Sequence, residues 1–170
     1  EPCTIKHIKG YKSESKSIGS GQVLQHPYDF ESAKLIVKEM TENLVLDLQS
    51  KDYISAYFSL IVGYEAIKEN GKKFIPKAAT GSFCTGEPSC VLSKIIERMM
   101  DLYDYIVNPN FFIRRLNLTA NNVVLQSSIP PELFEMEKCD KDETNVQKAV
   151  LQIQRKFGKN AMIKAHSLEE

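Results

Sequence analysis

A twelve-residue run without a charged side chain, Tyr53–Tyr64 (YISAYFSLIVGY), limits the possible folds more than any other stretch. It is dense in aromatic and β-branched residues, which favour β-strands. Its hydrophobic pattern is nearly continuous, which is typical of a strand in the middle of a sheet. The run is also too short to cross a membrane and is interrupted by Ser55 and Ser59. It therefore predicts a central strand in a packed domain.

Two segments with helical periodicity lie on either side of this strand. Asp29 is a favourable N-cap residue, and apolar side chains recur at helical spacing through Phe30–Ser50. A second apolar stripe runs through roughly Cys90–Val107, where Pro88 and Ser89 provide a helix start signal. The sequence thus predicts two amphipathic helices, each with one face available to cover a sheet.

Three more segments are expected to be strands. The first is Ser15–Gln25, which we expect Pro27 to end. The second is the short segment Thr80–Thr85, and the last is Phe111–Gln126. Glu65–Ala79 connects the central strand to Thr80–Thr85. It contains Asn-Gly and Pro, and we interpret it as an irregular connection.

The resulting order, β-α-β-β-α-β, predicts an α+β fold: a four-stranded antiparallel sheet with both helices on one face and the other face open. We expect a linker over residues 1–14, this domain over 15–126, and a tail over 127–170. In the tail, an acidic run precedes a helix that we expect Thr144 to cap and Gly158 to follow. An open face can bind nucleic acid, a second copy or a small ligand, and topology does not choose among these.

Composition excludes some functions. The 170 residues hold 22 basic and 22 acidic side chains, so the chain lacks the overall positive charge of many nucleic-acid-binding proteins. No nucleotide-binding, hydrolase or metalloprotease motif is present, and we identify no catalytic residue. The four cysteines lack metal-binding spacing, which favours free thiols in a reducing cytosol, so we expect no metal site and a cytoplasmic location.

The best candidate surface lies on the last strand. Side chains alternate faces along a strand, so Leu116 and Leu118 should face the helices while Arg115, Asn117 and Thr119 face the open side. A guanidinium, an amide and a hydroxyl are groups that contact phosphates.

The preceding arginine and the first strand extend this candidate surface. Strict alternation places Arg114 on the leucine side, from which it would reach a ligand only at the strand's end, or contact the helices instead. The segment Lys16–Ser20 (KSIGS) offers a lysine, hydroxyls and glycine-exposed backbone, the group types that position a phosphate backbone. Its alternative interpretation is an ordinary solvated edge strand. The candidate residues of this segment are Lys16, Ser17, Ile18, Gly19 and Ser20.

Several segments of the sequence resemble those of a known family. KSIG on the first strand and IRRL on the last resemble the little-finger, or polymerase-associated, domain of Y-family translesion DNA polymerases, which has the same element order. The opening EPCTIKHIKGYKSESKSIGSGQVL and the tail QKAVLQIQRKFGKNAMIKA resemble the bacterial UmuC/DinB-like ImpB/MucB/SamB group. From the first of these segments to the last, the resemblance extends over nearly the whole length of the chain. The chain also begins at Glu1 without a methionine, so we expect a piece of a longer protein.

The resemblance implies a role in DNA repair, in which the domain grips the backbone of primer–template DNA for an error-prone polymerase induced by DNA damage. The domain itself would be monomeric and without cofactor, because the catalytic carboxylates and their Mg²⁺ belong to a palm domain outside this sequence. The resemblance also implies a weak sliding-clamp peptide at Leu133 and Phe134, although the usual glutamine is missing.

One alternative stays open: a ferredoxin-like protein-interaction module that dimerises through the open sheet face. Tyr57, Ser59 and Ile61, on the uncharged central strand, would then form the centre of the interface.

Overall fold

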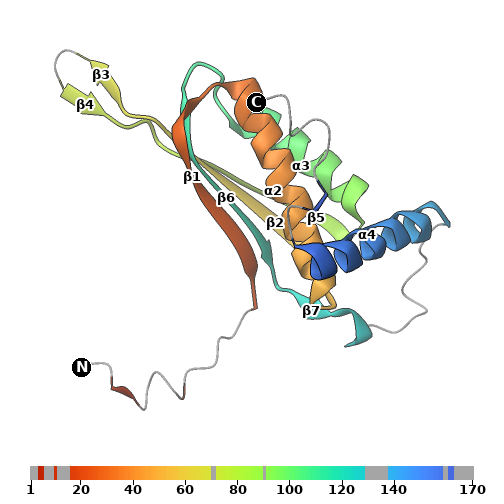
Figure 1. Cartoon of the computed structure of the whole chain (residues 1–170). Helices are drawn as coiled ribbons and strands as arrows, with labels where there is room; N and C mark the ends of the chain where they lie inside the picture. The colour runs from red at the N-terminus through yellow and green to blue at the C-terminus, as the bar shows by residue number, and fades with distance from the viewer. Residues whose placement is uncertain are drawn as a thin grey trace.

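The computed structural model describes residues 4, 5, 10, 16–69, 72–89, 91–128, 138–158, 161 and 162. Four long strands form one sheet in the order β1-β6-β2-β5, and every neighbouring pair is antiparallel (Figure 1). The α+β fold with a four-stranded antiparallel sheet is therefore confirmed, and β2 lies inside it as its uncharged sequence predicted. The strands are β1 (Ile18–Tyr28), β2 (Tyr53–Tyr64), β5 (Ala79–Ser89) and β6 (Ile113–Asn121).

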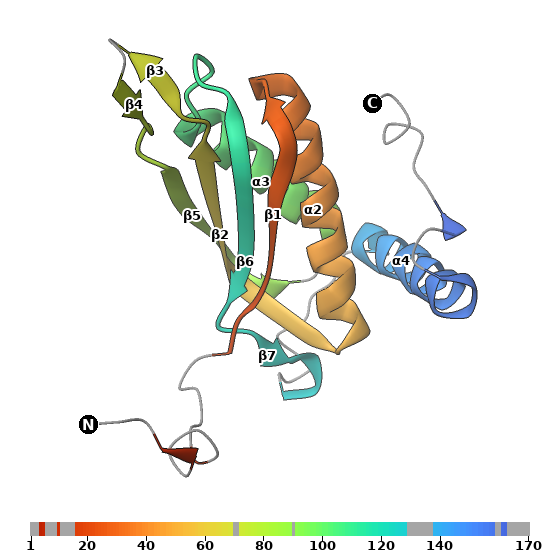
Figure 2. The same cartoon turned by 60° about the vertical axis from the view of Figure 1, so that its left-hand side comes forward.

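Two helices, α2 (Phe30–Ser50) and α3 (Leu92–Ile106), lie side by side on one face of this sheet, and the other face is open (Figure 2). The predicted cap of α2 is confirmed: Asp29 Oδ1 accepts a hydrogen bond from the Ser32 N–H at 2.8 Å. This hydrogen bond also lowers the pKa of Asp29 below its ordinary value, because it stabilises the charged carboxylate.

The hydrophobic core fills the space between the helices and the sheet. It forms because both helices and alternate positions of the strands turn apolar side chains to the same layer. At Gly81 of β5 a Cβ atom would lie 2.7 Å from Leu102 Cδ1, so glycine lets α3 approach the sheet closely. The largest fully buried side chains are Tyr103, Phe58, Leu48, Ile54, Leu60, Ile95, Met99, Ile113, Leu116, Leu118, Val37 and Val45.

Several predicted boundaries were wrong. β1 runs through Pro27 to Tyr28, which an edge strand tolerates because one side of its backbone has no neighbour to bond. β5 extends to Ser89, so Pro88 and Ser89 close a strand instead of opening α3. The connection expected to be irregular contains a hairpin of two short strands, β3 (Ile67–Glu69) and β4 (Lys72–Phe74).

The last strand is shorter than predicted. β6 ends at Asn121, where Asn122 turns the chain with a φ of 50°. A two-residue strand, β7 (Val124–Leu125), then pairs with the start of β2 at Tyr53 and Ile54, and a 3-10 turn, η1 (Gln126–Ser128), follows.

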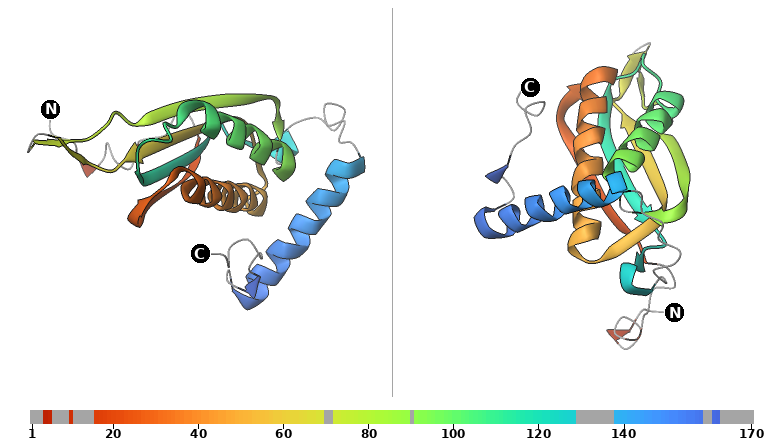
Figure 3. Two further views of the ribbon diagram at one scale, coloured as in Figure 1. Left: turned by 90° about the horizontal axis from the view of Figure 1, so that it is seen from above. Right: turned by 90° about the vertical axis from the view of Figure 1, so that its right-hand side faces the viewer.

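A long helix, α4 (Lys138–Phe157), crosses one end of the helical layer and reaches beyond it (Figure 3). It begins seven residues earlier than predicted, so Thr144 lies within it and is not its cap. Gly158 follows the helix with a φ of 95° and donates its N–H to the Gln154 carbonyl at 2.9 Å, which confirms its expected role.

Polar groups attach α4 to the ends of the other two helices. Glu143 accepts hydrogen bonds from the N–H and hydroxyl of Ser93, at 2.8 and 2.7 Å, at the start of α3. Arg155 donates to the Ser50 carbonyl at the end of α2, at 3.1 Å. Among the helices that the structure describes, none has the length and apolar character to cross a membrane.

Candidate nucleic-acid interface

The open face of the sheet carries the side chains that alternate with the buried core residues. Along β6, Leu116 and Leu118 are fully buried, whereas Arg115 is exposed and Thr119 half-buried, so the predicted alternation of faces is confirmed. The strand register places each open-face residue of β6 between residues of β1 and β2. Three cross-strand rows result: Val23/Arg115/Gly63, Gly21/Asn117/Ile61/Thr80 and Gly19/Thr119/Ser59/Ser82.

These rows form a polar surface with one basic group. At about 3.3 Å per residue, the distance from the first row to the third is roughly 13 Å along the strands. Arg115 is charged, and the other residues of these three rows are uncharged. The rows therefore contain no carboxylate that would repel a phosphate. Half of the other positions carry a hydroxyl or an amide, and the rest are glycine, valine or isoleucine. The surface is therefore suited to a polyanion that lies flat on the sheet.

Side chains of β6 occupy the space beside two glycines of β1. A Cβ atom at Gly21 would overlap Asn117 Oδ1, and one at Gly19 would lie 2.9 Å from Thr119 Oγ1. Asn117 and Thr119 thus lean over β1, and their polar atoms lie next to its backbone. Because β1 is an edge strand, it also presents backbone N–H and C=O groups on its outer side. Side-chain and backbone donors therefore lie together along this edge.

A hydrogen-bond network holds the end of the face farthest from Arg115. Asn121 Nδ2 donates to Ser59 Oγ at 3.1 Å, and Ser55 Oγ donates to the Asn121 carbonyl at 2.6 Å. These bonds fix the orientation of the Asn121 amide beside Tyr57, which is 49% exposed. At this end of the face, the polar groups of Asn121 and Ser59 therefore already bond to each other.

The predicted segment Lys16–Ser20 is split by the sheet. Gly19 lies on the open face, opposite Thr119. Ile18 packs against the core, and Ser20 pairs with Leu118, so its side chain starts on the helix side although it stays exposed. In this segment the ladder therefore puts only Gly19 on the open face, and Ile18 has only its backbone to offer a ligand.

The two ends of the predicted site lie far apart. Lys16 and Ser17 precede β1 and are exposed, and the Lys16 carbonyl accepts the Val123 N–H at 3.0 Å. Arg115 pairs with Val23, seven residues further along from Lys16. The structure thus arranges the predicted residues along an edge of the sheet and does not gather them at one point.

Arg114 occupies a β-bulge, which corrects its predicted side. Gly63 pairs with Arg115 and Tyr64 with Ile113, so Arg114 is an extra residue opposite β2. Its Nε lies 3.4 Å from Glu65 Oε2, and both side chains are about a third exposed. Arg114 is thus held by an ion pair at the strand's end and not among the leucines.

Sequence reasoning missed part of this surface. Asn121, Thr80 and Ser82 lie on it because of the strand order, which the sequence does not state. Alternation of side chains along each strand could have assigned these residues to the open face, but only with the strand order known. The expected clamp residues Leu133 and Phe134 lie outside the described residues.

Candidate metal ligands and thiols were sought in the described part of the chain. No group of three or more His, Cys, Asp or Glu side chains is placed there to hold a metal ion. Cys84 of β5 is a free, exposed thiol.

Comparisons with known proteins give similarities of shape. No protein-family model matches the chain, and no curated protein matches it. It is similar to the solved insertion ternary complex of Dbh DNA polymerase, with a TM-score of 0.48 and 12% identity over 70% of this chain and 33% of that one. It is also similar to the complex of the beta-clamp processivity factor and the little finger domain of PolIV, with a TM-score of 0.43 and 13% identity over 72% of this chain and 95% of that one. The chain spans about a third of the Dbh polymerase chain. Likeness at this level carries no inference about function, which has to come from the residues.

Proposed function

We propose that this chain is the DNA-binding little-finger domain of a Y-family translesion polymerase, and that its open face holds the backbone of primer–template DNA. The observation that carries the proposal is the pairing of β1 with β6. The KSIG and IRRL segments that bear the family resemblance are almost 100 residues apart in sequence. Ile18 and Gly19 of the first segment begin β1 and the second segment begins β6, so the two lie at opposite ends of this strand pair. From Arg115 at one end to Gly19 at the other, the open face presents glycine-exposed backbone, Asn117 and Thr119.

The chemical groups on this face are of the kind that bind the backbone of a duplex without recognising its base sequence. A guanidinium, an amide, a hydroxyl and edge-strand backbone groups all bind phosphate oxygens. Three rows over about 13 Å correspond to less than half of the roughly 34 Å turn of a duplex. Such a surface is expected to grip DNA of any sequence, as a polymerase that moves along a template requires.

The remaining features of the full-length protein are part of the same proposal. We place the Mg²⁺-dependent nucleotidyl transfer in a palm domain encoded outside this chain, in a cytoplasmic polymerase of the UmuC/DinB-like group. A sliding clamp is a further proposed partner, through Leu133 and Phe134. The protein sequence upstream of Glu1 tests the assignment: a segment without paired acidic palm motifs would contradict it. Failure of the chain to co-elute with a clamp ring would remove the clamp from the proposal.

Substitution of Arg115 tests the proposed DNA contact directly. Duplex binding by the 170-residue chain would be measured by fluorescence anisotropy at several salt concentrations, with a labelled primer–template. Loss of one phosphate contact should make the slope of log K against log salt shallower by about 0.9 in R115A. The matched control is R98A, which removes an exposed arginine from α3 on the helix side and should leave the slope unchanged. Equal slopes for R115A and R98A would remove Arg115 from the interface.

A second function is favoured by the apolar side chains on the same face. Val23, Tyr57 and Ile61 are 59, 49 and 41% exposed there. Such side chains could form the centre of a dimer interface between two open faces. Sedimentation equilibrium distinguishes the two functions: a tight dimer that I61E dissociates, together with no affinity for DNA, would favour the dimer.

A further inference from the structure

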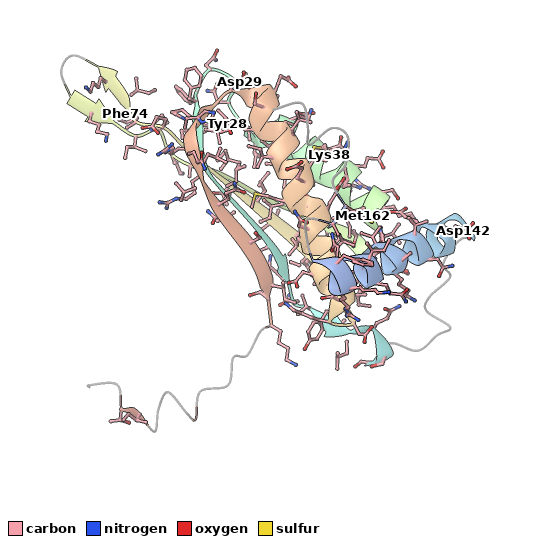
Figure 4. The ribbon with its side chains drawn as sticks, viewed as in Figure 1. Tyr28, Asp29, Lys38, Phe74, Asp142 and Met162 are labelled. Atoms are coloured by element: carbon pink, nitrogen blue, oxygen red, sulfur yellow. The ribbon has the colours of Figure 1, made fainter. Side chains whose placement is uncertain are left out.

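The β3–β4 hairpin reaches out past one end of the sheet, away from both covering helices (Figure 1). Its two strands follow β2 and precede β5, so it extends from the end of the sheet where Gly63 pairs with Arg115. Figure 4 shows Phe74 on this projection, far from the labelled residues of α2 and α4. The hairpin therefore continues the end of the open face that carries the guanidinium.

One side of the hairpin concentrates positive charge. Lys68 and Lys73 are directly opposite each other across the ladder, and both are exposed. Like charges in this position repel each other and weaken the strand pair. The segment 67–77 contains four lysines and one glutamate, a net charge of +3 in a chain whose total is zero. An anion placed against Lys68 and Lys73 would remove the repulsion, so the pair indicates an anionic ligand.

The pairs that alternate with Lys68 and Lys73 are Ile67 with Phe74 and Glu69 with Lys72, so two apolar residues lie on the other side of the hairpin. Ile67 pairs with Phe74 across the ladder, and the two side chains are 38 and 56% exposed. Ile75 follows with 63% of its surface exposed. None of these residues belongs to the hydrophobic core or packs against it. An exposed phenylalanine between lysines fits a partner that combines negative charge with apolar surface.

Duplex DNA has both properties and a shape that fits. A two-stranded β-ribbon enters the major groove, where phosphates line the edges and base edges and thymine methyl groups lie inside. The Glu65 carboxylate at the base of the hairpin is engaged by Arg114, and Glu69 is paired with Lys72 in the ladder, whereas Lys68 and Lys73 are paired with each other. Arg115 lies at the end of the sheet from which the hairpin extends, so a duplex held against Arg115 would have the hairpin beside it. An acidic protein surface would satisfy the lysines, but it lacks this continuity with the open face.

We propose that the β3–β4 hairpin enters a groove of the duplex held by the open face, with Lys68 and Lys73 on phosphates and Phe74 in contact with sugars or base edges. This inference rests on the proposed function of the open face. It adds a second contact that lies beyond the sheet and lengthens the footprint along the duplex.

The test uses the 170-residue chain, the same labelled primer–template and two variants of the hairpin. K68A/K73A should make the salt slope shallower by about 1.8, twice the contribution of one phosphate contact. F74A should weaken binding several-fold at every salt concentration without changing the slope, because the group lost is uncharged. K148A/K156A removes two exposed lysines from α4 and should leave both affinity and slope unchanged.

Folding and self-association provide the remaining readouts. Without DNA, K68A/K73A should melt at the same temperature as the parent chain or slightly higher at low salt, because a repulsion is removed. If R115A changes the slope but K68A/K73A behaves like K148A/K156A, the hairpin inference fails and the proposed function stands. If the parent chain does not bind duplex at all, both fail. A dimer that F74A dissociates, with unchanged DNA affinity, would make the hairpin a contact between copies and overturn the inference.

Discussion

The two faces of the sheet are made by the same strands and behave as opposite surfaces. On β6, Leu116 and Leu118 are completely buried under the helices, whereas their neighbours Arg115 and Thr119 face the open side. A shift of one position along this strand thus exchanges a core side chain for a surface one. Substitutions within the nine residues of β6 should therefore alter folding stability and the proposed DNA binding separately.

The largest effect is expected on the covered face. L118A removes a fully buried side chain and leaves a cavity between β6 and the helices, so it should lower the free energy of unfolding by about 3 kcal/mol. T119A, one position along on the open face, should change it by less than about 0.5 kcal/mol. Urea denaturation followed by circular dichroism measures both. Similar losses in the two variants would break the comparison, because the open face would then contribute to stability as the core does.

A polar group inside the helical layer gives a smaller effect. Tyr103 of α3 is fully buried, its ring lies 4.9 Å from that of Phe30, and its hydroxyl donates to the Phe30 carbonyl at 2.9 Å. Y103F keeps the ring and removes the hydrogen bond, so it should cost about 1 kcal/mol. The matched control is Y105F, on the same helix, where the side chain is 89% exposed and no loss is expected.

The same tyrosine predicts a pH dependence. Burial raises the pKa of Tyr103 above its ordinary value of 10.0, because the charged phenolate is disfavoured in the core. The folded protein therefore keeps this proton at pH values where the unfolded chain has lost it. The contribution is fully present below pH 10 and is lost as the pH rises above 10. The difference in stability between the parent chain and Y103F should shrink over that range, whereas an unchanging difference would show that Tyr103 does not titrate differently on folding.

The parts of the fold that could be predicted from the sequence are the long segments with a clear hydrophobic pattern. α2 begins and ends where its apolar stripe and Asp29 cap predicted, and β2 matches its uncharged run residue for residue. In these segments local preference and tertiary packing favour the same structure. The alternating faces of β6 were predicted for the same reason, and they supply the central residues of the candidate site.

The errors lie where distant residues decide the local structure. α3 begins at Leu92 with no side-chain cap on Val91, because Glu143 supplies the hydrogen-bond acceptor from about fifty residues further along. The bulge at Arg114 depends on how β6 pairs with β2. The strands β3 and β4 are too short to show a pattern, although the Asn70-Gly71 dipeptide between them is a hairpin signal that was available.

The smallest effect should come from the outer edge of the helical layer, where α4 is attached by polar contacts. The Glu143 carboxylate accepts two hydrogen bonds from Ser93 at the start of α3, where the helix dipole favours negative charge. E143Q keeps an acceptor and removes the charge, so it should cost about 0.5 kcal/mol. Because the contact is exposed, the loss should appear mainly as faster amide hydrogen exchange in α4 and in the first turn of α3.

Asp142 provides the matched control for this contact. It precedes Glu143 on α4 and its side chain is exposed, so D142N removes the same charge beside the contact and should leave exchange in α3 unchanged (Figure 4). Equal exchange in E143Q and the parent chain would show that the carboxylate does not hold α4 against α3. A loss in E143Q as large as in L118A would mean that α4 belongs to the core, and the covered side would then extend beyond the two helices that lie on the sheet.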